Sequence, residues 1–333
     1  MIVRTFLILW VLVLLYGCSD NQKKINKYDG FEETVSLKST PIEVPSVLLY
    51  PRNLFLLKEH LIVLNEKTDT LFQMFGMPDL KYQGQFGIKG EGPEDFTLPS
   101  IQAVSQDKQG FTLNDMNRLK SISVVGSEPH ISSVTLPYEF PYFNGLVKLK
   151  DSLYCCNAGY EAEYELRFLY PDGNYKDKGE YPEGVKPRFK SILTRNQAYN
   201  SLLIAKPDGA RLAVFYQHAR RFRIYDADGE LKTDNILNVS PCQELPAGND
   251  SERYIHPIFL YATDRYIYAL NLDMTSEEIE NRTGNPNIQI FDWEGHPVKQ
   301  YHLDCYISSF AVDEQNGCIY GVFIEDENHI YKL

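Results

Sequence analysis

Short runs in which apolar and polar residues alternate recur along this chain about every fifty residues. The alternation, together with many β-branched and aromatic side chains, predicts β-strands. The runs come in six pairs whose members are usually about ten residues apart. The first members lie at 61–65, 110–114, 152–157, 211–216, 266–271 and 318–322, and the second at 70–75, 121–125, 165–170, 221–225, 287–291 and 329–333.

Turn signals follow the second strand in three of the pairs, at 171–173, 226–229 and 292–295. Each ends in a glycine, which can take the left-handed backbone position of a tight hairpin. Asp226 to Glu230 has a spacing close to that of a calcium loop, but the later ligands do not follow in register, so we interpret it as a hairpin. An inner strand, the two predicted strands and an outer strand after the hairpin make up one propeller blade.

The sixth unit has no outer strand of its own, because its second strand ends at Leu333. The run Thr34–Lys38 near the start of the chain can supply it, which would join the first and last blades and remove an exposed sheet edge. We therefore predict an all-β fold, a six-bladed β-propeller closed by an N-terminal strand added to the last blade.

The N-terminus has the pattern of a secretory signal, with Arg4, an apolar run over 6–16, and Gly17 before Cys18. The run is too short for a typical membrane-spanning helix, although an uncleaved signal anchor is an alternative. Leu15, Gly17 and Cys18 resemble the lipobox of bacterial lipoproteins, which implies acylation of Cys18. We expect a signal peptide over 1–17, the lipidated cysteine and a flexible tether over 18–30, and a propeller domain over 31–333.

Composition narrows the possible partners. With 45 Asp plus Glu against 33 Lys plus Arg, the formal net charge is −12, which argues against nucleic acid as a partner.

Cys155 and Cys156 are adjacent and are expected on opposite faces of a strand. Cys305 and Cys318 are the one pair that we would test for a disulfide bond. No Cys-x-x-Cys spacing occurs, so neither a structural zinc site nor another cofactor is expected.

Residues 84–96 contain four glycines, as phosphate-binding loops do, but the spacing fits neither a Walker loop nor a dinucleotide fingerprint. We interpret the segment as a shaped loop between two sheets, held to the core by Phe96 and Pro99.

Three segments support a family resemblance: the lipobox at 15–18, the glycine-rich exit of the first blade at 87–96, and the loop 114–118 before a strand. In these the chain resembles the six-bladed TolB-like propeller lipoproteins of Bacteroides-type bacteria. The resemblance implies the fold and a lipid-anchored place in the cell envelope, in particular at the outer membrane. It implies no activity and no catalytic residues.

The loops predicted at one face of the ring collect many cations, which would focus a positive potential on an acidic protein. The candidate ligand-binding residues are Arg118, Arg188, His218, Arg220, Arg221, Arg253 and His256. Arginine suits carboxylate, sulfate or phosphate groups, so we expect an anionic glycan or a peptide as ligand, or an envelope protein as partner. The alternative is that these arginines pair with Glu91, Glu94, Asp95 and Glu183 in the same loops.

Catalysis has less support, because neither a Gly-x-Ser-x-Gly elbow nor a His-Glu-x-x-His helix occurs. His218 and His256 are the residues that would hold a metal on the loop face. The sequence thus predicts a binding module, and the alternative is a propeller-type hydrolase or lyase with a metal or a His/Arg site there.

Overall fold

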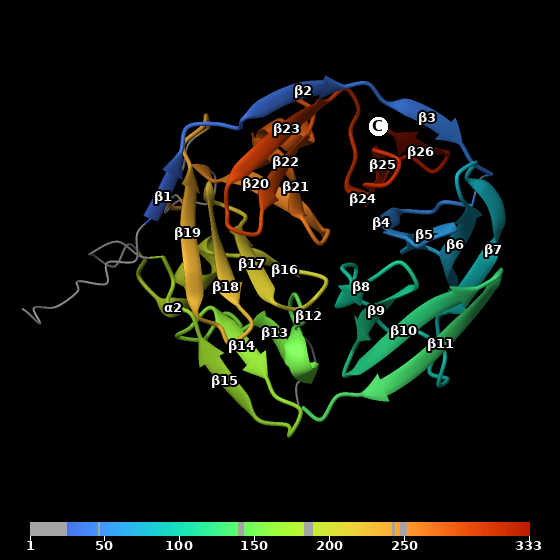
Figure 1. Cartoon of the computed structure of the whole chain (residues 1–333), viewed down its shortest axis with the longest axis horizontal. Coiled ribbons are helices and arrows are strands. Elements are labelled where there is room, and N and C mark those ends of the chain that lie inside the picture. The colour runs from blue at the N-terminus through green and yellow to red at the C-terminus, as the bar shows by residue number, and fades with distance from the viewer. Residues whose placement is uncertain (1–24, 46, 139–142, 183–188, 242–243, 247–251) are drawn as a thin grey trace, which may run out of the picture.

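The computed structural model of the chain describes residues 25–333 except 46, 139–142, 183–188, 242–243 and 247–251. Six sheets stand radially around a central axis, as Figure 1 shows, so the chain forms a six-bladed β-propeller. Cys18 and Arg188 lie outside the described residues. Among those described, no helix is long and apolar enough to cross a membrane.

Each blade consists of consecutive strands, numbered from the central axis outward. Blades 1 and 2 are β4 (Pro51–Leu56), β5 (His60–Asn65), β6 (Thr70–Gly76) and β7 (Lys81–Ile88), then β8 (Ser105–Gln106), β9 (Gly110–Asp115), β10 (Arg118–Val125) and β11 (Glu128–Thr135). Blades 3 and 4 are β12 (Val147–Lys148), β13 (Tyr154–Asn157), β14 (Leu166–Leu169) and β15 (Tyr175–Lys178), then β16 (Ser201–Ala205), β17 (Arg211–Tyr216), β18 (Arg221–Asp226) and β19 (Leu231–Leu237). Blades 5 and 6 are β20 (Tyr254–Ala262), β21 (Tyr266–Thr275), β22 (Asn287–Asp292) and β23 (Pro297–Leu303), then β24 (Ser309–Asp313), β25 (Cys318–Val322) and β26 (His329–Lys332).

All twelve strands predicted from the sequence are present, and the three hairpin glycines have positive φ, 86° at Gly173, 82° at Gly229 and 90° at Gly295. In the part of the chain that the structure describes, three short helical segments interrupt the strands: a 3-10 turn at Lys150–Ser152, α2 at Ile192–Ala198 and α3 at Ser276–Glu280. The side chains of Ser191 and Thr275 cap α2 and α3 by accepting hydrogen bonds from the third residue of each helix.

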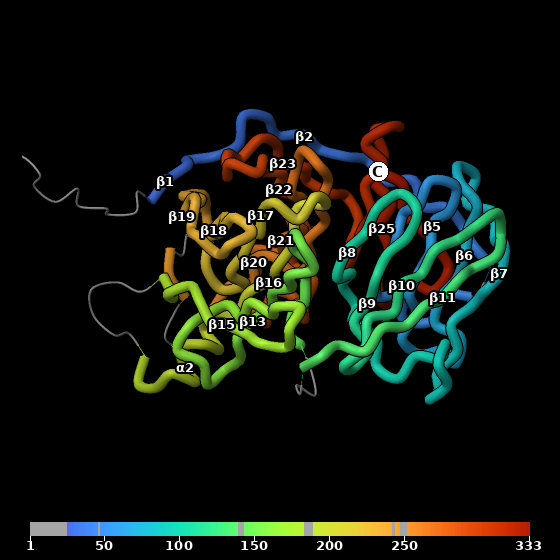
Figure 2. The backbone as a smooth tube through the Cα atoms, turned by 60° about the horizontal axis from the view of Figure 1, so that its bottom comes forward, coloured from blue at the N-terminus to red at the C-terminus, as the bar shows by residue number. Residues whose placement is uncertain are grey.

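The N-terminal strands pair with other blades than the sequence led us to expect. Thr34–Lys38 was expected to pair with the last blade, but β2 (Glu33–Leu37) pairs in parallel with β23 of blade 5. The outer strand of blade 6 is instead β3 (Thr40–Glu43), antiparallel to β26. Ile25–Tyr28, expected within the flexible tether, forms β1 in parallel with β19 of blade 4. Residues 25–43, which we call the strap, therefore run along the outer edges of blades 4, 5 and 6 (Figures 1 and 2).

The core lies between neighbouring blades. Phe55 of blade 1 stacks on Phe111 of blade 2 with ring centroids 3.9 Å apart. Cys155 packs between blades 3 and 4, whereas Cys156 packs between blades 2 and 3, so the adjacent cysteines occupy opposite faces of β13 as predicted. Cys305 and Cys318 are free thiols and form no disulfide bond with each other.

The glycine-rich segment was expected to be a loop, but its first residues, 84–88, belong to β7, and only the residues from 89 on lie in the connection to β8. Phe96 is fully buried, and the backbone amide of Gly92 donates to the carboxylate of Asp95 over 3.0 Å. The buried ammonium of Lys120 in β10 donates to the carbonyl oxygen of Pro93 over 2.6 Å. Asp115, at the end of β9, accepts hydrogen bonds from the backbone amides of Thr97 and Leu98. The segment therefore joins blade 1 to blade 2.

Candidate functional site

The predicted cationic residues that the structure describes do not form one group. Arg118 is exposed at the start of β10 in blade 2, and Arg253 is half-buried just before β20 in blade 5. Arg220 and Arg221 are buried and lie in adjacent positions at the start of β18, so their side chains point to opposite faces of blade 4. The structure brings Arg220 near His256 and His218, and it places Arg221 on the other side of the blade.

Arg221 belongs to a buried polar network between blades 3 and 4. Its guanidinium donates two hydrogen bonds, each of 2.6 Å, to the carboxylate of Asp234 in β19. Arg223 binds the same carboxylate and lies 3.2 Å from Glu165 of blade 3. Glu165 also accepts from the hydroxyl groups of Tyr216, over 2.5 Å, and Tyr225. This network satisfies the charge of Arg221 inside the fold.

Arg220 belongs to a second network, between blades 4 and 5. One terminal nitrogen lies 3.1 Å from the carboxylate of Asp273, and its Nε donates to the carbonyl of Pro241. Asp273 also lies 2.8 Å from Nδ1 of His256 and accepts from Nδ2 of Asn287 over 2.8 Å. His218 is close by, since its Nδ1 lies 3.0 Å from the carbonyl of Tyr254, whose ring stacks near His256.

The electrostatics of this second network follow from burial. Burial lowers the pKa of His256 below its usual 6.5, and the hydrogen bond to Asp273 opposes that shift only in part. Burial also opposes ionisation of Asp273, but the contacts with His256 and Arg220 outweigh it and lower the pKa of this carboxyl group. His256 is therefore neutral at pH 7, with Nδ1 as the donor to Asp273. Its Nε2 is buried and has no hydrogen-bond partner among the described residues.

A histidine held by a carboxylate is an arrangement that serves both metal binding and general base catalysis. Here the side chain is only 1% exposed, however, and it lines neither of the two pockets described below. Within the described part of the chain, no group of three His, Cys, Asp or Glu side chains is placed to hold a metal ion. Among the described residues, Arg220 pairs with Asp273 and Arg221 with Asp234. Glu183, one of the four loop residues that the sequence suggested, lies outside the described residues.

A large cleft opens elsewhere, between blades 2 and 3. It has a volume of about 690 Å³ and extends to the inner strands of blades 1, 4 and 5. The two inner strands beside it are short, because β8 and β12 contain only two residues each. Gln102 of blade 2 can therefore reach blade 4 directly, where its Nε2 donates to the carbonyl of Leu203 over 2.9 Å.

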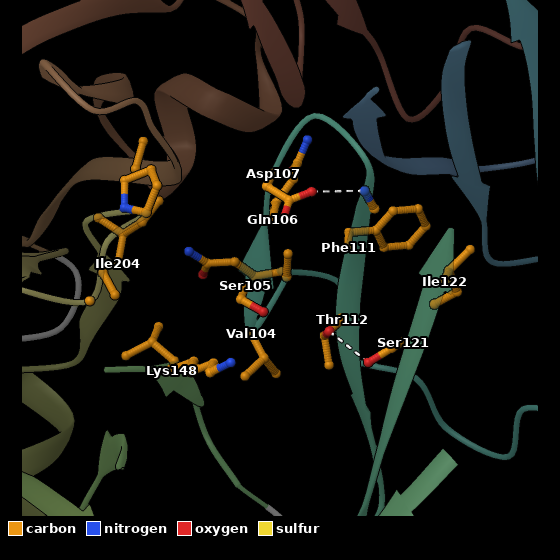
Figure 3. A pocket seen from close by; sticks show the side chains of 18 of the residues that line it. Val104, Ser105, Gln106, Asp107, Phe111, Thr112, Ser121, Ile122, Lys148 and Ile204 are labelled. Carbon is orange, nitrogen blue, oxygen red and sulfur yellow. Dashed lines mark hydrogen bonds between the residues drawn. The ribbon is translucent and has the colours of Figure 1, made fainter. Parts of the chain in front are cut away.

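One wall of this cleft is a sheet face covered with hydroxyl groups. The register of blade 2 places Ser105 opposite Thr112, Thr112 opposite Ser121, and Ser121 opposite Ser132. These four residues, which we call the hydroxyl row, cross all four strands at the usual strand spacing of about 4.8 Å. Thr112 Oγ1 and Ser121 Oγ are 2.9 Å apart. Figure 3 shows Ser105, Thr112 and Ser121 directed toward the cleft.

The opposite side of the same strands is apolar. Phe111 and Ile122 also contribute to the lining of the cleft, and their buried side chains pack with the blade 1 core. On the face of the hydroxyl row, Leu119 lies two residues before Ser121 in β10 and packs with residues of blade 3. Blade 3 thus covers one end of this blade 2 face and leaves the hydroxyl row open.

Lysine and aspartate side chains both line the cleft. Lys148 of β12 is exposed, reaches into the cleft from blade 3 (Figure 3), and makes no ion pair with any described residue. Lys206 lies 3.2 Å from Asp208, which partly satisfies its charge. Asp107 accepts hydrogen bonds from the backbone amides of Gln109 and Gly110, so its carboxylate is engaged in a turn. Lys150 and Asp151 also line the cleft and are exposed, and the charge of Lys150 acts on Asp208. Lys148 is the lysine that Figure 3 shows directed into the cleft.

Sequence reasoning missed this cleft, because alternating Ser, Thr and His residues are also typical of an ordinary solvent-facing strand. The available signal was that Ser121, Ser123, His130 and Ser132 are polar on a face that a neighbouring blade should cover.

Comparison with known proteins agrees with the architecture. The chain aligns over 90% of its length with the crystal structure of a DUF4221 family member from Bacteroides vulgatus, of which 96% is covered, with a TM-score of 0.61 and 12% identity. It aligns over the same share with the WD40 repeats of RRP9, covering 98% of that chain, with a TM-score of 0.53 and 8% identity. A streptogramin B lyase structure has a TM-score of 0.47 and 9% identity, with 88% of this chain and 96% of that chain covered.

No curated protein sequence matches the chain significantly. The likeness to solved structures concerns the fold alone, because every identity is low. Residues 29–315 match the model of the TolB-like 6-blade propeller-like family. Since this match spans most of the chain, the protein belongs to the TolB-like six-bladed propeller family.

Proposed function

We propose that the protein is a lipid-anchored binding module of the cell envelope, without catalysis, and that the cleft between blades 2 and 3 holds an anionic, hydroxyl-rich ligand such as an acidic glycan. The observation that carries the proposal is the open hydroxyl row beside Lys148 in a cleft of about 690 Å³. Ligand pockets typically measure about 300–1,000 Å³.

The chemistry of the walls supports this ligand class. Hydroxyl groups both donate and accept hydrogen bonds, so a row of them matches the alternating donors and acceptors of a sugar chain. An ammonium group without an acidic partner favours a ligand that carries a carboxylate or sulfate. Arg220 and Arg221, in contrast, already bind carboxylates of the protein, so the proposed site lies away from them.

Binding to an array of acidic and neutral glycans tests the proposal. We expect an acidic glycan to bind, Lys148→Gln to weaken it about tenfold or more, and Ser132→Val to weaken it about threefold to tenfold. Lys176→Gln, an exposed lysine on β15, and Ser133→Val, the exposed neighbour of Ser132 on the other face of β11, are the matched controls. Equal loss in a variant and its control, or no binding by any glycan, would contradict the proposal.

The anchor is tested separately. Cells that express the full chain are expected to incorporate labelled fatty acid into the protein and to hold it in the membrane fraction. Cys18→Ala should abolish the label and release the protein, because the lipobox cysteine is the acylated residue. Labelling that persists in this variant would assign the membrane attachment to another feature.

The second candidate is a hydrolase or lyase site at His256, and the buried, unpartnered Nε2 favours it. A substrate would have to reach an imidazole that is 1% exposed, so the geometry supports binding better. Metal analysis and a screen for hydrolysis with wild type and His256→Gln distinguish the two. Stoichiometric metal or turnover that His256→Gln abolishes would favour the enzyme.

A further inference from the structure

A second pocket lies at the other end of β16, between blades 3 and 4. It has a volume of about 410 Å³, within the size range of small-molecule sites. Its walls come from the β13–β14 loop, from α2 and from the start of β16. Ser201, the first residue of β16, lines this pocket, whereas Ala205, the last, lines the cleft between blades 2 and 3.

The walls of this pocket are held in place by hydrogen bonds. Nδ2 of Asn196 in α2 donates to the carbonyls of Tyr160 and Ala162 over 2.9 and 2.8 Å. Asn157 and Ser201 bond reciprocally, with Asn157 Nδ2 donating to the Ser201 carbonyl and Ser201 Oγ donating to Asn157 Oδ1. A pocket fixed in this way loses little conformational freedom when a ligand binds.

Aromatic rings form the apolar part of the lining. The rings of Tyr181 and Tyr199 lie 5.7 Å apart at an angle of 47°, and Arg195 stacks on Tyr181 at 4.3 Å. Tyr160 lies in the β13–β14 loop and is 49% exposed, so its ring is available to a ligand. Rings next to Asn and Ser side chains suit a ligand that has both an apolar ring face and hydroxyl groups.

The charged residues of this pocket have partners within the protein. Arg167 donates to Asp177 through two hydrogen bonds of 2.7 and 2.8 Å. The carboxylate of Glu165 is engaged by Tyr216, Tyr225 and Arg223. The pocket therefore favours a neutral ligand, unlike the cleft with Lys148.

We infer that the pocket lined by Tyr160, Tyr181 and Asn157 is a second binding site, separate from the cleft, and that it takes a neutral sugar ring. The inference extends the proposed function to two sites of different charge preference at opposite ends of β16. A glycan that has acidic and neutral parts, or two chains, would then be held at two separate points of the ring.

Saturation-transfer NMR with a panel of neutral methyl glycosides tests the inference, at low and high salt. We expect one or more glycosides to bind with little dependence on salt, and Tyr160→Ala to weaken binding about fivefold to tenfold. Tyr164→Ala is the matched control, because Tyr164 belongs to the same loop, is 41% exposed and does not line the pocket.

Lys148→Gln distinguishes the two sites. Neutral glycoside binding that survives Lys148→Gln and weakens in Tyr160→Ala supports the second site whether or not an acidic glycan binds in the cleft. Binding that Lys148→Gln removes and Tyr160→Ala leaves unchanged assigns the glycosides to the cleft and overturns the second site. If no glycoside binds, the second site is also overturned, and the proposal that the cleft binds an acidic glycan is not affected.

Discussion

Arg220 and Asp273 form an ion pair, with nitrogen and oxygen 3.1 Å apart, that joins blade 4 to blade 5. The next residue, Arg221, turns to the opposite face and binds Asp234. Two adjacent arginines thus stabilise different blade interfaces, and their charges are balanced by carboxylates within the protein. The expectation of one arginine cluster on the loop face did not take account of this alternation along the strand.

Asp234 should be important for stability, because it is buried and binds both Arg221 and Arg223. Asp234→Ala leaves two buried guanidinium groups without this partner, and we expect the free energy of unfolding to fall by about 3–5 kcal/mol. Urea denaturation measures the change. Glu66→Ala, which removes the exposed partner of Arg52, is the control and should cost at most about 1 kcal/mol. Similar losses in both variants would refute the prediction.

Stability should depend on pH through His256. Its pKa is lower in the folded protein than its usual 6.5, so the unfolded chain binds the proton first as pH falls. The free energy of unfolding should therefore be constant above about pH 7 and decrease as pH falls below about 6.5, by at most about 1.4 kcal/mol per pH unit from this group.

His256→Gln should flatten that decrease, and His130→Gln, at an exposed histidine, should not. Urea denaturation of the three proteins between pH 5 and pH 8 provides the comparison. If His256→Gln has the same dependence of unfolding free energy on pH as the wild type, a group other than His256 takes up the proton.

Gly209 lies at the end of the β16 hairpin, where blade 4 approaches blade 3. Its φ is +69°, and a Cβ atom would lie 2.7 Å from the backbone carbonyl carbon of Leu149. Gly209→Ala should destabilise the protein by about 1–3 kcal/mol or more, because the contact is with backbone. Gly317→Ala is the control for the positive φ alone, since Gly317 has φ +63° but nothing within 4 Å of a Cβ. Equal effects in thermal unfolding would count against the steric explanation.

The adjacent cysteines should be unreactive in the folded protein. Burial raises the pKa of Cys156 to about 12 and also raises the pKa of Cys155, so neither thiolate is populated at neutral pH. Labelling by iodoacetamide, followed by peptide mass spectrometry, should modify the less buried Cys318 well before either of them. All three should react once denaturant is added. Rapid native labelling of Cys156 would contradict the burial described for it.

The strand pairs were predictable from the sequence because alternation and hairpin glycines are local features. β8 and β12, whose residues line the cleft, were not, since a two-residue strand has no period. The strand that pairs with Thr34–Lys38 could not be predicted either, because several blades have a free outer edge and the alternation of residues 34–38 suits each of them. The Asp273–His256 contact depends on two bulged strands, whose shifted register no local pattern reveals.

The strap has a mechanical consequence. If the chain is held by the proposed lipid anchor, a pull on it acts on β1, and the load passes through β2 and β3 to three successive blades. A pull along the strap shears several backbone hydrogen bonds at once instead of opening them one after another. Half of the ring would share the tension, so a pull from the proposed anchor would not peel the chain away from its first strand.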